Sequence, residues 1–411
     1  MDEEQAASHH SVLGMLQNAK SSLMKQVAPE LFTHEMAHSV AKKYPQFAEL
    51  IDLWMSLGDM STLWGFKRSL GEAPSVWYDF VQYILDLIST HPAFDQTLRA
   101  LPPRFSPVLE GRNPLELVDS RLQPWSIVDF AELRRLADIL YEDSKMPRWY
   151  TKTEHSYSAS ATAIRFLTSC TQRTRSHIRK VILIEDEVSV AQPECHGRGF
   201  ISQCQENAKL QIERRVNLWK SVWPVCETGK MEYIKGAESY MDCEDMKDDR
   251  LLACDVTRTV APWLMETMVL PSLGMPEGSY KLVLDGNPTP EHTSDVFRIV
   301  QRDATWQAAL DESYSRDAFP EPASWLDRRR RSGFIFEGLP SVIDAISTEG
   351  SLIRCNFELS IPYDVEAMLE EHRGWAIEQW EQKWWEHEPL KFQTEPPLPQ
   401  WHILRWQHVL D

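Results

Sequence analysis

The stretch Arg175–Trp223, RSHIRKVILIEDEVSVAQPECHGRGFISQCQENAKLQIERRVNLWKSVW, decides the fold class. It opens with the apolar run VILI, which leads into three consecutive carboxylates. A loop that holds Cys195 and His196 follows, and residues 206–222 then space their apolar side chains as an amphipathic helix does. A strand, a loop and a helix in this order are typical of an intracellular α/β protein. The stretch holds no phosphate-binding glycine loop, nucleophile elbow or complete metal-ligand set, so it predicts no reaction.

The pattern of the chain changes near residue 150. Residues 10–145 place apolar side chains three and four apart in successive segments, which predicts helices. From residue 151 onward, strands are predicted at 155–159, 180–185, 280–285 and 352–359, and helices at 160–169, 206–222, 294–310 and 365–389. We therefore predict an α+β fold: a helical region at 1–145, then an α/β domain at 150–411 with a small, partly parallel sheet. An exposed acidic insertion is expected near 227–250.

Composition indicates a globular chain with no nucleic-acid or membrane partner. The 411 residues, 43% of them hydrophobic, can bury a core. The formal net charge of -18 would repel a phosphate backbone. No apolar run approaches the roughly 18 residues of a membrane span, and the first residues lack a secretory-signal pattern. The seven cysteines have no framework spacing and suit free thiols, so a cytoplasmic or nuclear location is expected.

Residues 34–38 (HEMAH) match the HExxH signature of zinc peptidases. On a helix, His34 and His38 would share one face and hold Zn²⁺, while Glu35 would polarise the attacking water. No glycine and third histidine follow at the metzincin spacing, so another acid would have to supply the third ligand. The alternative is a partly exposed helix face without a metal.

Carboxylates follow two of the predicted strands. Glu185 and Asp186 come after VILI, and Asp285 comes after KLVL. Ligands of open α/β sheets bind beyond the carboxyl ends of the strands, so these acids would meet and bind a metal if the strands were parallel neighbours. The alternative is a solvated turn that caps a following helix.

Cysteine, histidine and arginine residues supply three weaker candidates. Cys195, His196 and Cys204 would offer soft metal ligands or an activated thiolate, and the alternative is a buried loop. Arg214 and Arg215, expected on a helix, would pair structurally with Glu185 or Asp186. The run at 328–331 is either a nuclear-import patch or a solvated loop.

The C-terminal 40 residues are rich in tryptophan. Residues 365–389 are predicted to form one helix, and most of its tryptophans pack on the domain because they share a face. Trp385 points away from that face. Together with Trp401 and Trp406 it would provide an anchor for a protein partner.

Several blocks of the C-terminal part carry a family resemblance. They are RKVILIED at 179–186, SVAQPECH at 189–196, CQEN at 204–207, IERRVNLW at 212–219, YSASATAIRFL at 157–167, VQRDATWQAAL at 300–310 and IRCNF at 353–357. These blocks resemble a group of uncharacterised fungal proteins, many of them described as F-box-like, over about residues 130–411. The Leu-Pro-x-Glu helix with which such proteins often open has no clear match in residues 1–60.

From the sequence we expect a non-catalytic, intracellular protein-interaction or adaptor protein that needs no cofactor. The alternative is a zinc-dependent hydrolase that uses His34, Glu35 and His38. A third hypothesis is a metal enzyme that uses the carboxylates Glu185, Asp186 and Asp285.

Overall fold

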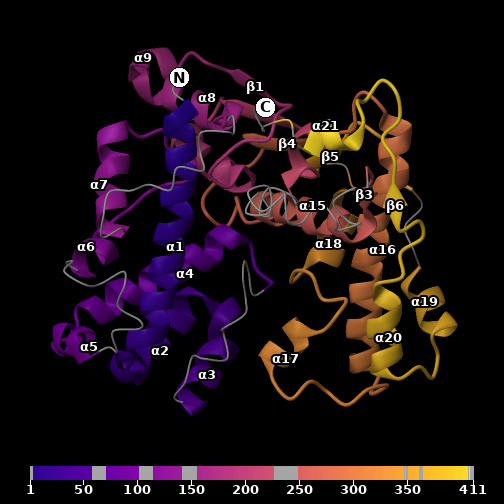
Figure 1. Ribbon diagram of the computed structural model, residues 1–411, viewed down its shortest axis with the longest axis horizontal. Helices are drawn as coiled ribbons and strands as arrows, with labels where there is room; N and C mark the ends of the chain where they lie inside the picture. Colours follow the sequence, from indigo (N-terminus) through magenta and orange to yellow (C-terminus); the bar gives the residue numbers. More distant parts are fainter. Residues whose placement is uncertain are drawn as a thin grey trace, which may run out of the picture.

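A small sheet lies near the top of the molecule in Figure 1, and helices make up most of the remainder. The computed structural model describes residues 3–57, 71–100, 114–140, 155–225, 249–346, 348, 350–360, 364–405 and 407. The predicted α+β class with a helical N-terminal region is confirmed. Trp406 and all but the last two residues of the predicted acidic insertion lie outside the described residues. Within the described part of the chain, no helix combines the length and the apolar character needed to cross a bilayer.

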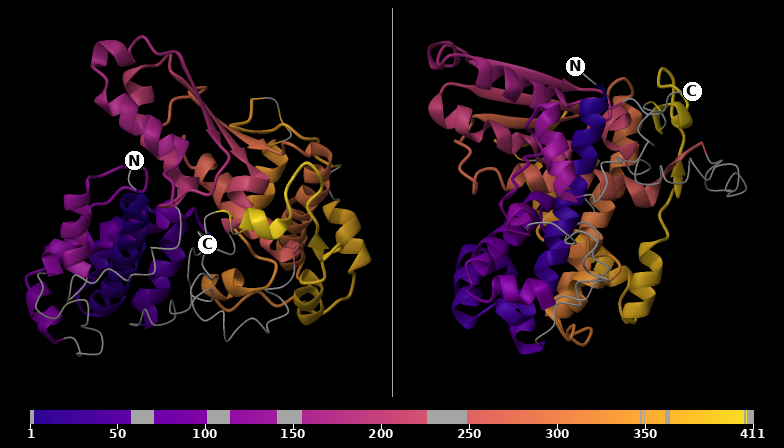
Figure 2. Two further views of the ribbon diagram at one scale, coloured as in Figure 1. Left: turned by 45° about the horizontal axis from the view of Figure 1, so that its top comes forward. Right: turned by 60° about the vertical axis from the view of Figure 1, so that its left-hand side comes forward.

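The helices of the N-terminal region pack around the first of them. They are α1 (Glu3–Leu31), α2 (His34–Lys43), η1 (Pro45–Phe47), α3 (Ala48–Leu57), α4 (Pro74–Ser89), α5 (Phe94–Ala100), α6 (Pro114–Asp119) and α7 (Phe130–Leu140). α1 contacts α4, α5, α6 and α7, and Figure 2 shows it running through the middle of this group. Its buried residues Leu13, Leu16, Leu23 and Val27 recur at helical spacing, which explains why this segment is both helical and central.

The C-terminal region alternates strands with helices. Its first part contains α8 (Ala159–Ser169), α9 (Gln172–Arg175), β1 (Lys180–Glu185), η5 (Pro193–Phe200), α10 (Ile201–Glu206), β2 (Gln211–Asn217) and the π-helix η6 (Leu218–Val222). Its second part contains β3 (Leu251–Leu252), α15 (Ala253–Met268), β4 (Tyr280–Asp285), α16 (Pro290–Ser315), α17 (Trp325–Arg330), α18 (Leu339–Ile346), β5 (Ile353–Cys355), α19 (Val365–Glu371), α20 (Ile377–Trp384), β6 (Lys391–Phe392) and α21 (Trp401–Arg405).

The main sheet is parallel throughout and has the strand order β1-β2-β4-β5. β1 and β4 occupy the residues predicted for them, and β5 lies inside its predicted range. The strand predicted at 155–159 is reduced to a single bridge between Ser156 and Ser189. β3 and β6 form a separate antiparallel pair.

Among the described residues, the strand order leaves one face of the main sheet without crossover helices. Connections between parallel strands are almost always right-handed. Because each later strand is added in the same direction, right-handed connections all lie on one face, here called the inner face. There Arg214 of β2 lies 4.6 Å from the ring centroid of Trp263 in α15, and Tyr280 of β4 packs against Gly197 of η5. The opposite, outer face carries Lys180, Ile182, Ile184, Gln211, Glu213, Arg215, Asn217, Lys281, Val283, Asp285 and Arg354.

Both regions contribute to one continuous hydrophobic core. Buried side chains in contact run from Ala6 of α1 to Leu404 of α21. A second cluster gathers Trp306 of α16 with Trp380 and Trp384 of α20. The helical region is therefore packed onto the α/β region.

The prediction of a helix at 206–222 is wrong. α10 ends at Glu206, and residues 211–217 form the strand β2. Ile212, Arg214 and Val216 are buried and alternate with more exposed residues, which is the period of a strand. The helix was predicted from the spacing of apolar residues, and because Arg214 is charged, its place in the buried alternation was not visible in that spacing.

The single helix predicted at 365–389 is also wrong. α19 ends at Glu371 and α20 begins at Ile377. Gly374 lies between them with φ +77°, a left-handed conformation that side chains with a Cβ disfavour. This residue allows the chain to turn so that Trp380 and Trp384 reach α16.

We expect Gly374→Ala to lower the free energy of unfolding by about 1 kcal/mol, because alanine is strained at positive φ. The added methyl would meet no atom within 4 Å, so a clash does not contribute. Urea unfolding measures the change. Ala376→Gly, two residues on at negative φ, is the control. Equal stability of Gly374→Ala and the parent would contradict the explanation.

Candidate functional site

The HEMAH motif lies on α2, at the surface of the helical region. Thr33 caps this helix by accepting a hydrogen bond from the backbone N–H of Met36. The side chains of His34, Glu35 and His38 are exposed. Among the described residues, no group of three histidines, cysteines or acids is placed to hold a metal ion. The described part of the chain therefore does not complete the zinc site.

Glu185 lies at the end of β1, but it is buried and engaged by protein groups. Its carboxylate accepts from Arg214 Nε at 2.9 Å, from Ser160 Oγ at 2.7 Å and from the backbone N–H groups of Ala159 and Ser160 at 3.1 and 3.2 Å. The carboxylate thus links the N-terminus of α8 to β2. The helix dipole favours a negative charge at this end of α8. Burial alone would raise the pKa of Glu185, but the Arg214 charge and the Ser160 hydrogen bond outweigh it and lower this pKa.

The three carboxylates predicted to bind a metal are not brought together. β2 separates β1 from β4, so Glu185 and Asp285 are on the order of 10 Å apart along the sheet edge. The strand register also places Glu185 and Asp285 on opposite faces of the sheet. Glu185 lies on the same face as Val216 and Leu284, and Asp285 follows Leu284 directly, so it lies on the other face. Asp285 accepts from Asn356 Nδ2 at 2.5 Å, and Asp186 is exposed.

A buried serine–histidine pair lies next to this network. Ser158 Oγ is 2.6 Å from His196 Nδ1, and His196 Nε2 donates to the carbonyl of Ala191 at 2.8 Å. Burial, followed by the Arg214 charge, lowers the pKa of His196 to about 3, so the ring is neutral. Ser158 is only 1% exposed. The pair therefore links α8 to η5 and is not accessible to a substrate.

Cys195 and Cys204 are also buried. Burial raises the pKa of both thiols, and Glu266 raises that of Cys195 further. The Sγ of Cys195 lies 3.2 Å from the carbonyl of Gln192. These environments favour the thiol over the nucleophilic thiolate.

Of the two predicted anchors of the tryptophan-rich tail that the structure describes, one lies at the surface. Trp385 is 51% exposed. Trp401 is only 2% exposed and packs edge-on against Trp219. Trp401 therefore contributes to the core, where a partner does not reach it, and Trp406 lies outside the described residues.

The arginine run at 328–331 is held by ion pairs. Arg328 contacts Asp311 at 3.1 Å and Glu337 at 3.4 Å. Arg329 is buried and contacts Glu72 at 3.1 Å and Glu337 at 3.2 Å. These pairs fasten α17 to its surroundings.

The outer face of the sheet combines exposed isoleucines with basic side chains. Ile182 is 50% exposed and Ile184 is 61% exposed, both on the edge strand β1. Glu213 pairs with Lys180 and Arg215, each at 2.6 Å. The other two cations of this face, on β4 and β5, form no ion pair with a described residue.

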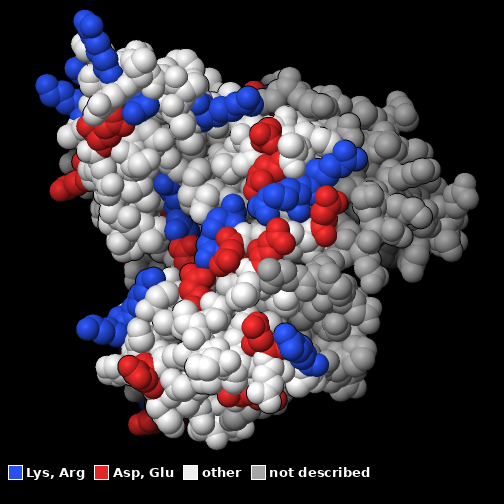
Figure 3. Space-filling view, turned by 90° about the vertical axis from the view of Figure 1, so that its left-hand side faces the viewer, with Lys and Arg blue, Asp and Glu red and all other residues white. Residues whose placement is uncertain are grey.

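The face seen in Figure 3 has a different character. Acidic and basic side chains lie next to one another there, without a large area of one sign. The helical region contains exposed ion pairs, such as those of Arg135 of α7 with Glu132 at 2.8 Å and with Glu116 at 3.3 Å. Exposed pairs of this kind contribute little free energy.

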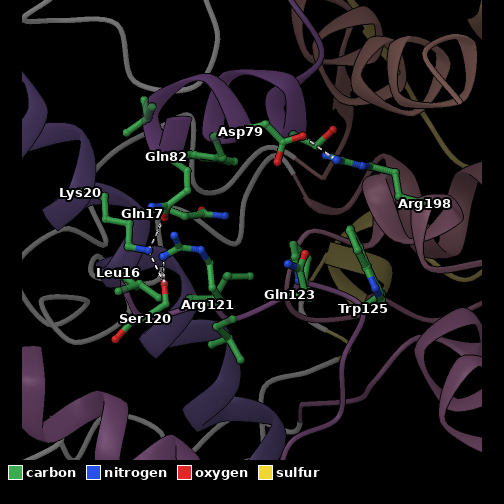
Figure 4. A pocket seen from close by; sticks show the side chains of 16 residues that line it. Leu16, Gln17, Lys20, Asp79, Gln82, Ser120, Arg121, Gln123, Trp125 and Arg198 are labelled. Atoms are coloured by element: carbon green, nitrogen blue, oxygen red, sulfur yellow. Dashed lines mark hydrogen bonds and ion pairs between the residues drawn. The ribbon is translucent and has the colours of Figure 1, made fainter. Parts of the chain in front are cut away.

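A hollow of about 100 Å³ lies between α1, α4, the segment after α6 and η5 (Figure 4). Lys20 lies at one end with Arg121 beside it, and Arg198 enters from the other end. Arg198 donates to Asp79 at 2.5 Å and lies 5.5 Å from the ring centroid of Trp125. Burial, followed by the charge of Arg121, lowers the pKa of Lys20 to about 7.

Sequence reasoning missed this hollow because its residues come from four separate segments. One signal was present. Lys20 falls on the buried stripe of α1, between Leu16 and Leu23. A lysine on an apolar helix face is rarely buried unless its ammonium group is paired.

Comparisons of the chain with protein-family models, with curated proteins and with solved structures found no match.

Proposed function

We propose that this protein acts by binding another protein, and that the outer face of its sheet takes an acidic segment of the partner. The observation that supports this most directly is the exposure of Ile182 and Ile184 on a parallel sheet. Parallel sheets are usually covered on both faces. An open face with apolar side chains is therefore a natural contact surface.

The charge of the outer face indicates what it binds. Its strand residues include four cations, Lys180, Arg215, Lys281 and Arg354, and two acids, Glu213 and Asp285. The chain as a whole has a formal net charge of -18, so this face opposes the overall sign. An acidic segment with apolar residues would complement both its charge and its isoleucines.

The edge position of β1 suggests how such a segment would bind. Among the described strands, β1 pairs only with β2, so its other edge has backbone groups available for pairing. An extended segment added there would form main-chain hydrogen bonds and place alternate side chains beside Ile182 and Ile184.

Fluorescence anisotropy with a labelled ten-residue peptide of alternating Glu and Val tests this proposal. We expect the full chain to bind this peptide, with an affinity that falls as salt rises, and to bind the Lys-Val counterpart at least tenfold more weakly. The double substitution Ile182→Glu, Ile184→Glu should weaken binding of the acidic peptide at least tenfold.

Leu57→Glu, at an equally exposed apolar position on α3, is the matched control and should change nothing. Trp385→Ala tests the exposed tryptophan of the tail, the alternative contact site. Equal binding of both peptides, or unchanged binding by the double isoleucine variant, would contradict the sheet-face proposal. A loss of binding with Trp385→Ala alone would move the interface to the tail.

An adaptor role of the kind that the F-box-like resemblance implies is compatible with this proposal. It stays a prediction, since the comparisons provide nothing that bears on it. The zinc-hydrolase alternative has no support beyond the spacing of HEMAH.

A further inference from the structure

Lys20 is a buried cation without an anion in contact. It is only 7% exposed, and its ammonium group donates to the amide oxygen of Gln82 at 2.5 Å and to the carbonyl of Ser120. No carboxylate of the described residues lies within ion-pair distance of it. An ammonium group can donate three hydrogen bonds, so one donor is not used by these two acceptors. Burying a charge against neutral acceptors alone is costly.

Two further cations reach the same hollow. Arg121 contacts Asp86 at 2.8 Å, and 42% of its side chain is exposed, which places it at the rim. Arg198 contacts Asp79, the one carboxylate among the residues that line the hollow. Asp86 and Asp79 thus neutralise Arg121 and Arg198, and the charge of Lys20 remains without a contacting acid in the described part of the chain, so the hollow favours an anion.

The rest of the wall combines apolar side chains with the polar side chains of Gln17, Ser75, Gln82, Ser120 and Gln123. Leu13 and Leu16 of α1, Val81 of α4 and Trp125 of the segment after α6 line it. A cavity of about 150 Å³ holds a ring of six carbon atoms, so about 100 Å³ suits a ligand of roughly four to six non-hydrogen atoms. This combination fits an anion that has a short hydrocarbon part.

We infer that this hollow is a binding site for a small monocarboxylate, with the carboxylate on Lys20 and Arg121 and the hydrocarbon part against Leu16, directed toward the Trp125 end of the hollow. The site is separate from the outer face of the sheet. It lies in the helical region, so a bound carboxylate would join α1 to the segment after α6 and stabilise the packing of these elements.

Calorimetric titration of the full chain with propionate tests this inference, with propionamide as the neutral analogue and inorganic phosphate as the alternative oxyanion. We expect propionate to bind at one site per chain, at least tenfold more tightly than propionamide or phosphate. Lys20→Met should weaken propionate binding at least tenfold, and Arg121→Gln several-fold. Lys42→Met removes an exposed lysine of α2 and should have no effect.

The pH dependence gives a second readout. The ammonium form of Lys20 binds the anion, so raising the pH from 7 to 9 should weaken binding at least tenfold in the parent and much less in Lys20→Met. The charged and titratable groups that face Lys20 or line the hollow with it are Arg121, Asp86, Asp119, Asp79, Arg198 and Tyr78. A pH dependence that persists in Lys20→Met would assign the effect to one of these groups and overturn the role of Lys20.

Equal affinity for propionate and propionamide would overturn the anion assignment. Tighter binding of phosphate than of propionate, lost in the same variants, would overturn the carboxylate assignment. Circular dichroism establishes that each variant is folded. If Lys20→Met does not fold, Arg121→Gln decides, and unchanged binding in that folded variant refutes the inference.

Discussion

Replacing Arg214 with methionine should lower the free energy of unfolding by about 3–5 kcal/mol, the largest effect that we expect from one substitution. The guanidinium of Arg214 is fully buried and pairs with Glu185, whose side chain is 2% exposed. Without it, a buried carboxylate retains only the hydrogen bonds from α8. Removing one partner of such a pair is costly because the other charge stays uncompensated.

Urea unfolding of three variants isolates this effect. Arg215→Met is the matched control, since Arg215 is the next residue on the same strand and its ion pair lies on the outer face. It should cost less than about 1 kcal/mol. Adding Glu185→Leu to Arg214→Met should recover most of the stability, because no unpaired charge is left. A double variant as unstable as the single one would show that packing of Arg214 on Trp263, and not its charge, determines the loss.

Replacing Glu266 with glutamine should make the protein more stable than the parent by about 3 kcal/mol at pH 8, and by much less at pH 5. Glu266 of α15 is buried and accepts hydrogen bonds from the backbone N–H of Ser75 at 2.7 Å and from Ser75 Oγ at 2.6 Å. Burial raises its pKa from 4.5 to about 7, although the two bonds from Ser75 and the charge of Arg198 oppose this.

The direction of the change in stability with pH follows from proton binding by Glu266. Between pH 4.5 and 7 the folded chain keeps the proton of Glu266 and the unfolded chain releases it, so stability falls as pH rises through this window. Glutamine keeps the shape and carries no charge at any pH. Unfolding free energies at pH 5 and pH 8 measure the difference, with exposed Glu277→Gln as the control. A Glu266→Gln variant that is less stable than the parent at pH 8 would contradict the proposed protonation.

Some strands could be read from the sequence because local pattern alone determines them. β1 and β4 are short apolar runs that end in acids, and their bounds were predicted correctly. β2 was missed because its alternation depends on a buried arginine, whose partner Glu185 lies 29 residues earlier. The tail helix was predicted too long because Gly374 was not considered as a break.

The candidate sites show the same distinction between local and long-range information. The pairing of an arginine of IERRVNLW with Glu185 or Asp186 was anticipated, and the structure confirms it for Arg214 and Glu185, although on a strand. The spacing of His34 and His38 could not supply a third ligand. Ile182 and Ile184 are exposed because the strand order puts β1 at the edge and leaves its outer face open. This strand order cannot be predicted from a single sequence. Lys20 lines the hollow together with residues that are up to 178 positions away in the chain, and no local sequence pattern connects these residues.

The ion pair between Glu185 and Arg214 also constrains the order in which the chain assembles. The carboxylate that starts α8 lies at the end of β1, and its counter-ion is 29 residues further on. A nascent chain that stops before Arg214 would have to bury Glu185 without neutralising it. α8, β1 and β2 should consequently become ordered together, as one cooperative unit, only after residue 214 has been synthesised.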